Sequence, residues 1–372
     1  MSHDLNQVPF FDYKTFFSAE RDRILELIDQ VASTGGFIMQ TDLALFEKNL
    51  AGLCNANGAV GVGNATDALE MALSVYNLEK GDEIIISSHT MVATASAVKF
   101  AGAIPIPVEI TPEGLMDPDD AERAITKNTV GIMPTQLNGR VCDMDRLLEI
   151  KEKYGLVLVE DAAQSLGARY KDRYSGTFGD SSCVSFYPAK TLGCLGDGGA
   201  LLVNNPDMLE TFQMMRDHGR SKSGEIEIWG RNSRLDNLQA AILNDKLSRY
   251  DQAISYRRSL AALYYSRLFD LHELKLPPNP LKDTTVFDIC QNYEVLVEKR
   301  FELQQYLRER GIGTLVQWGG KAIHQLKKLG FKQELPKTDD YFRKCLLLPL
   351  NTMVTKDDVN YVCDAIIDFY RK

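Results

Sequence analysis

The chain has 372 residues, of which 44% are hydrophobic and 25% charged, values typical of a soluble globular protein with about two domains. Its net charge of -9 argues against general binding to the phosphate backbone of nucleic acids. The seven cysteines lack zinc-site spacing, the N-terminus does not resemble a signal peptide, and no apolar run approaches the ~20 residues of a membrane span. We therefore expect a cytoplasmic protein with reduced thiols and no metal or membrane partner.

Strand and helix patterns alternate through the first half of the chain. Helices are expected at 18–32, behind a serine cap, at 43–53, and from residue 68 onward, after a strand at 59–62. Further strands are expected at 83–86, 104–108, 130–134, 156–160, 184–187 and 199–203, with helices at 94–100, 118–125 and 144–154. Apolar strands separated by helices indicate a largely parallel sheet covered on both faces, with ligands at the carboxyl ends of its strands.

The pattern changes beyond residue 200. The sequence predicts a helix at 208–215, one long helix at about 238–268, a strand at 292–297, and helices at 301–310 and 356–370. These elements are typical of a smaller α+β domain behind a connecting helix. We therefore divide the chain into a large domain, 1–245, and a C-terminal domain, 246–372.

The turn between the strand at 59–62 and the following helix is suited to holding a phosphate. The first N–H groups of a helix are unpaired and lie at the positive end of its dipole, and Thr66 can add a hydroxyl donor. The alternative is that Thr66 or Asp67 simply caps the helix. A GxGxxG fingerprint is not present here, so a Rossmann cofactor is not indicated.

Lys190 follows an apolar and aromatic run that ends at Pro188, and it precedes a loop with four glycines before Ala200. A lysine between a strand end and such a loop can project into a pocket, lose its proton and attack a carbonyl. Taken alone, the segment also fits a solvated loop lysine, which is the commoner case.

Asp161 stands at the end of the strand 156–160, where a carboxylate is costly unless it meets a cation or hydrogen-bond donors. The small residues after it leave room for a flat ligand, although Asp161 could instead only cap the next turn. Gln164 is a less strongly marked candidate. His89 follows the strand 83–86 and could stack on a ring or simply pack.

Taken together, these segments resemble the DegT/DnrJ/EryC1/StrS family of pyridoxal-phosphate-dependent sugar aminotransferases, which have the aspartate aminotransferase fold. The markers are GFIMQTDLALFEKNL, VGVGNATDALEMAL, SSHTMVATASAV, VEDAAQSLGARYK, FGDSSCVSFYPAKTLGCLGDGGA and GRNSRLDNLQAAIL. The resemblance covers nearly the whole chain. It implies an α/β fold of type I, in which helices sandwich a mostly parallel seven-stranded sheet and a smaller α+β domain follows.

The resemblance also implies pyridoxal 5'-phosphate as cofactor and assigns roles around its ring. Lys190 resembles the lysine that carries the cofactor covalently. Asp161 resembles the partner of the pyridine nitrogen, and Gln164 the neighbour of the ring hydroxyl. His89 sits where the family places a group stacked on the ring.

Further residues are implied to bind the cofactor phosphate. Ser185 resembles part of the phosphate cradle, together with the turn at Thr66 and Asp67. Asn232 resembles the residue that reaches the phosphate from the second subunit, which implies a homodimer with shared active sites.

Two segments depart from the family pattern. Ala65 stands where the family commonly has glycine, which matters only if the position needs a positive φ. Gln317-Trp318-Gly319 stands where relatives acting on nucleotide sugars often have His-Tyr-Pro. Trp318 offers a flat face for a sugar or base, Gln317 an amide, and Lys321 a positive charge for a phosphate or carboxylate. The alternative is that Trp318 packs inside the small domain and Lys321 is solvated.

The resemblance implies transfer of an amino group, from glutamate, to a keto- or aldehydo-sugar, most often a nucleotide-linked keto-sugar, in amino-sugar and surface polysaccharide or lipopolysaccharide biosynthesis. A free sugar acid is the alternative acceptor. A sugar dehydratase on this fold would carry histidine in place of Lys190, and a non-catalytic relative would have lost part of the set Lys190, Asp161 and Ser185. Both are disfavoured.

Overall fold

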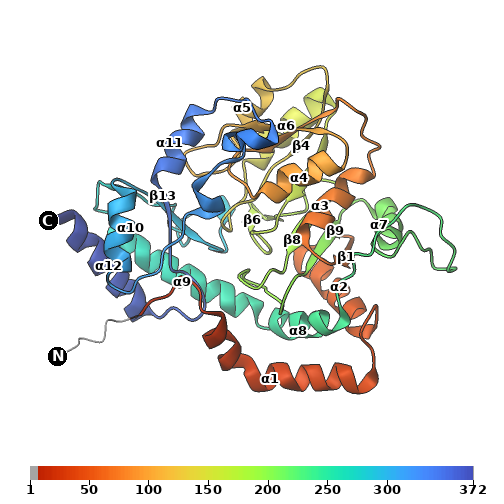
Figure 1. Cartoon of the computed structure of the whole chain (residues 1–372), viewed down its shortest axis with the longest axis horizontal. Helices are drawn as coiled ribbons and strands as arrows, with labels where there is room; N and C mark the ends of the chain where they lie inside the picture. The colour runs from red at the N-terminus through yellow and green to blue at the C-terminus, as the bar shows by residue number, and fades with distance from the viewer. Residues whose placement is uncertain (1–6, 372) are drawn as a thin grey trace.

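The computed structural model describes residues 7–371 and contains a large α/β domain and a smaller C-terminal domain (Figure 1). One seven-stranded sheet, in the order β1-β9-β8-β5-β4-β2-β3, organises the large domain. Its strands are β1 (Gly58–Val62), β2 (Glu83–Ser87), β3 (Ile104–Val108), β4 (Thr129–Met133), β5 (Val157–Asp161), β8 (Ser181–Ser185) and β9 (Gly199–Val203). Only β9 runs antiparallel to its neighbours, so the mostly parallel sheet predicted from the sequence is confirmed.

The strands are mostly apolar and largely buried because helices cover both faces of the sheet. Successive residues of a strand point to opposite faces. Accordingly, Leu158 belongs to one hydrophobic core and its neighbour Val159 to another. The helices of the large domain are α1 (Tyr13–Thr34), α2 (Thr41–Cys54), α3 (Ala65–Ser74), α4 (Val92–Phe100), α5 (Pro118–Arg123), α6 (Met144–Tyr154), η1 (Pro206–Met208), α7 (Leu209–Arg216) and α8 (Asn237–Leu247).

The C-terminal domain has its own core around the three-stranded sheet β10-β12-β13, against which α9, α10 and α12 pack. Its elements are α9 (Tyr250–Leu268), β10 (Leu274–Lys275), β12 (Tyr293–Val297), α10 (Arg300–Arg308), η2 (Gln317–Gly320), η3 (Ile323–Gln325), η4 (Lys327–Leu329), α11 (Pro336–Lys344), β13 (Cys345–Leu348) and α12 (Lys356–Arg371). A third small sheet joins β6 (Arg169–Tyr170) and β7 (Arg173–Tyr174) of the large domain to β11 (Val286–Phe287).

Several element boundaries differ from the sequence prediction, and three of the differences have a physical reason in the structure. The strand predicted at 184–187 begins at Ser181, because small serine side chains fit the sheet interior, where the Ser182 hydroxyl donates to the Gly176 carbonyl. The helix predicted from residue 18 begins at Tyr13, capped by Asp12 rather than by a serine. The single helix predicted at 238–268 is two helices, since Arg249 leaves helical geometry between α8 and α9.

The segment before α1 packs on the C-terminal domain. Val8 exchanges backbone hydrogen bonds with Gly311 and Gly313 and belongs to the C-terminal hydrophobic core. The division at residue 245 stays a prediction, and at Val8 the packing departs from it.

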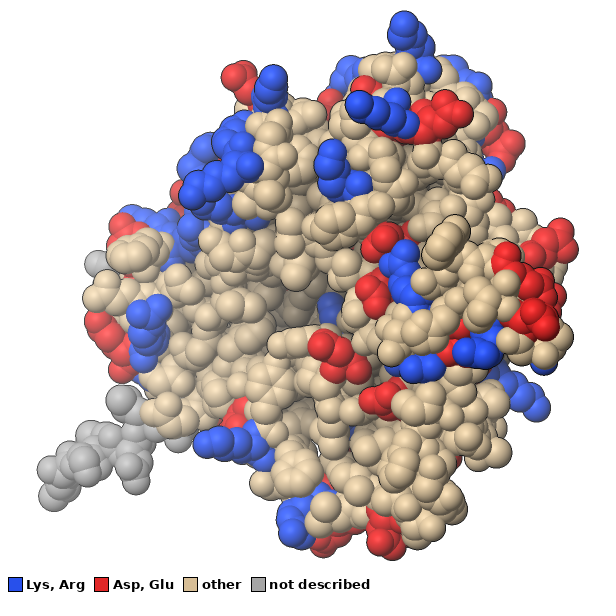
Figure 2. All heavy atoms as spheres, turned by 45° about the vertical axis from the view of Figure 1, so that its right-hand side comes forward, with Lys and Arg blue, Asp and Glu red and all other residues tan. Residues whose placement is uncertain are grey.

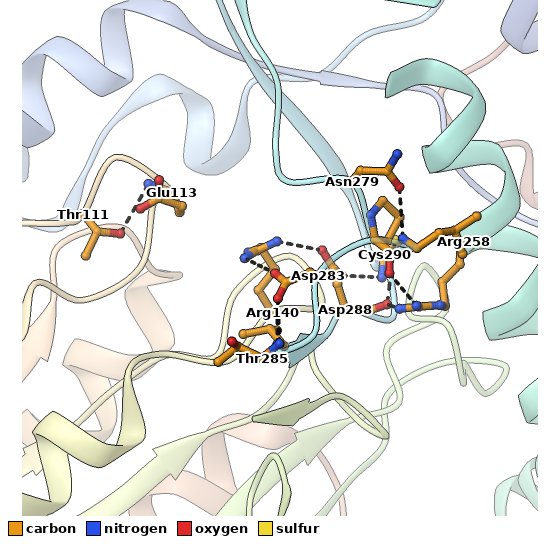
Figure 3. A network of polar contacts seen from close by, with 12 residues as sticks. Thr111, Glu113, Arg140, Arg258, Asn279, Asp283, Thr285, Asp288 and Cys290 are labelled. Atoms are coloured by element: carbon orange, nitrogen blue, oxygen red, sulfur yellow. Dashed lines mark hydrogen bonds and ion pairs between the residues drawn. The ribbon is translucent and has the colours of Figure 1, made fainter. Parts of the chain in front are cut away.

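Two arginines fasten the segment that leads into the C-terminal sheet (Figure 3). Arg140, which follows β4, lies 3.4 Å from carboxylate oxygens of both Asp283 and Asp288. Arg258 of α9 donates to the backbone carbonyls of Asp288 and Pro280. The Arg140 contacts join the two domains after β4, whereas the Arg258 contacts lie within the C-terminal domain.

Acidic and basic side chains are interspersed over the face shown in Figure 2, and a hollow lies near its centre. All seven cysteines are buried free thiols. Among residues 7–371, no helix has the length and apolar character needed to cross a membrane.

Candidate active site

A cavity of about 410 Å³ lies at the carboxyl ends of the central strands. The turn before α3, the start of α4, and the ends of β4, β5 and β8 all contribute to its wall. Its polar lining comprises Asn64, Thr66, Thr90, Thr135, Asp161, Gln164, Ser185, Lys190 and Asp197. Six residues predicted from the sequence therefore meet in one place: Thr66, Asp161, Gln164, Ser185, Lys190 and Trp318.

Lys190 is half-buried and also lines a neighbouring cavity of about 290 Å³ on the side of the C-terminal domain. Burial lowers the pKa of its amine to about 8, although the negative charge of Asp161 opposes the shift. An amine with this pKa is partly neutral near pH 7, so Lys190 can act as a nucleophile and as a proton carrier.

Asp161 is buried at the end of β5, where three donors meet its carboxylate. Oδ2 accepts from the Thr94 hydroxyl at 2.7 Å. Oδ1 accepts from the Ala163 backbone N–H at 3.1 Å and from the Cys183 thiol at 3.5 Å. The bond to Ala163 shows that Asp161 does cap the next turn, as the alternative proposed, while it also lines the cavity.

Gln164 has a fixed orientation. Its Oε1 accepts from the Asn138 backbone N–H at 2.9 Å and from Asn292 Nδ2 at 3.3 Å. Because both partners donate to Oε1, the amide N–H₂ of Gln164 is left for whatever occupies the cavity.

The turn before α3 forms the anion-binding end of the cavity. Asn64, and neither Thr66 nor Asp67, caps the helix by accepting from the Asp67 N–H at 2.9 Å. In the part of the chain that the structure describes, no acceptor is found for the backbone N–H of Ala65 or Thr66. Two free N–H groups at a helix start bind an anion well.

Gly199 makes this arrangement possible. A Cβ atom on Gly199 would lie 2.5 Å from the backbone carbon of Asn64 and 2.6 Å from the nitrogen of Ala65. The strand β9 can therefore lie directly against the turn only with glycine at this position.

Asp67 is not among the residues that line the cavity. Its carboxylate accepts from the Ser233 hydroxyl at 2.5 Å and from Asn64 Nδ2 at 3.1 Å. It braces the turn against the segment after α7 rather than presenting a charge to the cavity.

The structure does not bring His89 to the cavity, so the predicted contact with the ring is wrong for this conformation. The imidazole is fully buried, with ring centroids 5.2 Å from Tyr341 and 4.8 Å from Phe342. Burial lowers its pKa, opposed by Glu294, whose Oε1 lies 3.7 Å away. Thr90 and Met91, which come next in the chain, line the cavity instead.

Two of the three candidate residues in the segment 317–321 line a cavity, with Gln317 at the cavity of about 290 Å³ only. Trp318 lines both the 410 Å³ and the 290 Å³ cavities. Gln317 is buried, and its Nε2 donates to Asn138 Oδ1 at 2.9 Å and to Glu294 Oε1 at 3.2 Å, so its amide N–H₂ is already used. Lys321 is exposed and lines neither cavity.

Asn232 is exposed and lies beside Asp217, outside the cavity lining of its own chain. Its position leaves the side chain available to a second subunit.

The family model for the DegT/DnrJ/EryC1/StrS aminotransferases matches residues 18–367. The chain belongs to this family. A dTDP-3-amino-3,4,6-trideoxy-alpha-D-glucose transaminase of Streptomyces venezuelae is 36% identical over 97% of this chain and 95% of its own length. A UDP-2-acetamido-2-deoxy-3-oxo-D-glucuronate aminotransferase of Pseudomonas aeruginosa is 32% identical over 96% of this chain and 99% of its own length.

Solved structures agree. NtdA of Bacillus subtilis, solved with bound cofactor PMP, is 26% identical and superimposes with a TM-score of 0.90 over 100% of this chain and 87% of its own. The protein is therefore an aminotransferase with the fold of this family. The alanine at position 65, where the family commonly has glycine, costs nothing, because Ala65 begins α3 and is not among the residues with positive φ.

Sequence reasoning missed the uncharged polar residues that hold the two predicted side chains. Thr90, Thr94 and Thr135 form hydrogen bonds leading to Asp161, while Asn138 and Asn292 hold Gln164. The spacing of Thr90 and Thr94 was a usable signal, because residues four apart lie on one side of a helix start. Asn138 and Asn292 are far apart in the chain and gave no such signal.

Proposed function

We propose that the protein is a cytoplasmic, pyridoxal-phosphate-dependent transaminase that moves an amino group from glutamate to a nucleotide-linked keto-sugar in amino-sugar biosynthesis. The observation that carries this proposal is the pairing of Lys190, with a pKa of about 8, and the buried carboxylate of Asp161 in one cavity. The relatives that act on dTDP- and UDP-linked sugars support the substrate class, and the relative with bound PMP supports the cofactor.

The cavity lining fits this cofactor at both ends. The cofactor phosphate carries about two negative charges, which suit the free N–H groups of Ala65 and Thr66 and the hydroxyls of Thr66 and Ser185. At the ring end, Asp161 would meet the protonated pyridine nitrogen and the amide of Gln164 the ring hydroxyl.

When bound, pyridoxal phosphate supplies an electron-accepting ring that makes a carbanion next to nitrogen tolerable. Asp161 holds the proton on the ring nitrogen through its negative charge. With the cofactor bound, Lys190 Nζ would be the group that takes a proton from the substrate and gives it back. Fixing this amine beside the reacting atoms can be worth an effective concentration of ~10⁵–10⁸ M.

Two further side chains of the cavity lining would contact the cofactor ring and the sugar. Met91 lines the cavity, and its thioether would contact the ring face in the place first assigned to His89. Trp318 lies between the two cavities, where its indole would contact the sugar.

We further propose a homodimer with shared active sites, in which Asn232 reaches the cofactor phosphate of the partner subunit. Large apolar side chains are exposed on nearby segments, with Trp229 97% exposed and Phe37 51% exposed. The Phe37 carbonyl accepts from the Asn237 backbone N–H, so the segment of Phe37 lies beside the start of α8. Large exposed apolar side chains are candidates for a subunit contact.

Hybrid dimers test the shared site. A Lys190→Ala protein mixed with an Asn232→Ala protein should recover activity, because some mixed dimers contain one intact site. Confirmed subunit exchange without recovery would contradict the shared site.

A substrate panel tests the acceptor. The purified protein should show a visible absorption band that bleaches with glutamate, and the glutamate-treated protein should then aminate dTDP- or UDP-linked keto-sugars. Free keto- or aldehydo-sugar acids serve as the contrasting set, since they need a cation but no nucleotide contact. Turnover confined to the free acids would overturn the nucleotide-sugar assignment and leave the transaminase assignment intact.

A further inference from the structure

Three threonines lie side by side at the carboxyl ends of neighbouring strands, next to Asp161. Thr90 follows β2, Thr94 is in the first turn of α4, and Thr135 follows β4, which pairs with β5. Their side chains are buried, with Thr90 and Thr94 at 0% exposed and Thr135 at 4%. A buried hydroxyl is costly unless it is hydrogen-bonded, so the partners of these three groups are fixed by the fold.

The hydroxyls form one continuous chain of hydrogen bonds. Thr135 Oγ1 donates to Thr90 Oγ1 at 2.8 Å. Thr90 Oγ1 lies 2.6 Å from Thr94 Oγ1, and Thr94 Oγ1 donates to Asp161 Oδ2 at 2.7 Å. The chain therefore starts at the cavity wall and ends on the carboxylate.

The direction of the middle bond follows from the proton count. Each hydroxyl has one proton to donate, and the proton of Thr94 is used on Asp161. Thr94 must then accept from Thr90, which in turn accepts from Thr135. All three protons point toward Asp161.

This direction favours one protonation state of Asp161. A proton on Oδ2 along the line to Thr94 would need Thr94 as its acceptor, and Thr94 would then have to donate to Thr90, and Thr90 to Thr135. Protonation along this line therefore requires all three hydroxyls to turn around, whereas the carboxylate accepts the bond as it stands. Hydrogen bonds to the charged form stabilise that form.

We propose that Thr135, Thr90 and Thr94 are a one-way hydrogen-bond relay that holds Asp161 as a carboxylate, and that Thr94 is thereby a positioning residue for transamination. The proposal rests on the proposed function, because Asp161 acts there on the ring nitrogen of the cofactor. Thr90 and Thr135 line the cavity, whereas Thr94 does not, so Thr94 acts only through Asp161.

A matched pair of substitutions separates the hydroxyl of Thr94 from its shape. Thr94→Val keeps the branched shape and removes the hydroxyl, while Thr94→Ser keeps the hydroxyl and removes the methyl group. The cofactor dissociation constant of each holoenzyme is measured with pyridoxal phosphate and with its 1-deaza analogue, which lacks the ring nitrogen. Only the first compound can use the charge of Asp161.

A hydrogen bond to a charged group contributes about tenfold to a hundredfold. We expect Thr94→Val to weaken pyridoxal phosphate binding and turnover by about this factor and to shrink the preference over the deaza analogue equally. Thr94→Ser should keep the wild-type preference. Equal losses in both variants, or a Thr94→Val protein with an unchanged preference, would overturn the relay.

The far end of the relay provides a second test if Thr94→Val fails to fold. Thr90→Val and Thr135→Val leave the bond from Thr94 to Asp161 in place, so each should reduce the preference, with Thr135→Val having the smaller effect. A larger effect for Thr135→Val than for Thr90→Val would contradict the proposed order. Wild-type protein that binds neither compound would instead disprove the proposed function.

Discussion

The two side chains assigned to the cofactor ring are held in different ways. Asp161 is held only by groups of the large domain, namely Thr94, Ala163 and Cys183. Gln164 is held by Asn138 and Asn292, and Asn138 is bonded in turn to residues of the C-terminal domain: Gln317 and Glu294. Asp161 is therefore held within the large domain, whereas Gln164 is coupled to the C-terminal domain.

Of the substitutions at or behind these two side chains, replacing Asp161 should reduce turnover the most. Asp161→Asn removes the negative charge with little change in size, so the ring nitrogen loses the group that keeps it protonated. We expect turnover to fall by about 10²–10³-fold or more, as for other preorganised electrostatic groups. Steady-state kinetics of the purified variant measure this, with cofactor content determined in parallel. Near-normal turnover would rule out the assigned role.

Substituting Glu294 tests how Gln164 is held, because Glu294 is bonded to Asn138. Its carboxylate accepts from Asn138 Nδ2 and from the Tyr341 hydroxyl, at 2.8 and 2.9 Å, and from Gln317 Nε2. Glu294→Gln would bring an amide N–H₂ against these donors, at a cost of about 1–3 kcal/mol for each unsatisfied group. We expect a lower melting temperature and about tenfold lower turnover, because Asn138 no longer holds Gln164 firmly.

The control for this variant is Glu302→Gln, an exposed carboxylate on α10, which should behave as wild type. The preference for pyridoxal phosphate over the deaza analogue should survive in Glu294→Gln, because Asp161 is untouched. Loss of that preference would show that the contacts holding Gln164 also affect Asp161.

Substitutions in the segment 317–321 should have smaller effects, and they separate contact with the sugar from support of the fold. Trp318→Ala should raise KM for the sugar about tenfold, as expected for loss of an aromatic contact of about 1 kcal/mol or more, and leave the half-reaction with glutamate intact. Gln317→Ala should reduce stability more than it changes KM, because its amide is bonded to Asn138 and Glu294. Lys321→Ala should change neither quantity. A large KM effect from Lys321→Ala would indicate that the loop moves when substrate binds.

The smallest expected effect concerns Lys190 in the protein without cofactor. The pKa of this amine is about 8 in the fold, against an ordinary value of 10.5, so between these values the unfolded chain binds more protons than the folded one. Stability of the apoprotein should therefore rise with pH from about 8 to 10.5, and the destabilisation by Lys190 is complete below pH 8.

The Lys190→Met apoprotein should accordingly melt higher than wild type near neutral pH, and the difference should fade as the pH approaches 10.5. Thermal melts over this range measure it, with Lys321→Met as the exposed control. A difference that grows with pH would contradict the lowered pKa.

The sequence located the site well because its main residues sit at strand ends. A parallel sheet brings the carboxyl ends of its strands to one edge. Asp161 and Ser185 end two paired strands, and Lys190 follows Ser185 by five residues. The apolar run before Asp161 placed that residue at a strand end, whereas Ser185 was assigned to the site through the family resemblance, since its strand was predicted at 184–187.

The errors came from side-chain direction. His89 and Thr90 are adjacent in the chain, yet only Thr90 lines the cavity, because the His89 ring is buried against Tyr341 and Phe342. Asp67 and Gln317 belong to the right segments, but stronger partners hold them: Ser233 for Asp67, Asn138 and Glu294 for Gln317. Such partners are distant in sequence, and no local pattern reveals them.

The central claim, that Lys190 carries the cofactor beside Asp161, is tested most directly by chemical labelling. Borohydride reduction of the holoenzyme, followed by digestion and peptide mapping, should fix the cofactor on the peptide that contains Lys190, and the Lys190→Ala protein should retain no label. Label on any other lysine of the wild-type protein would contradict the account.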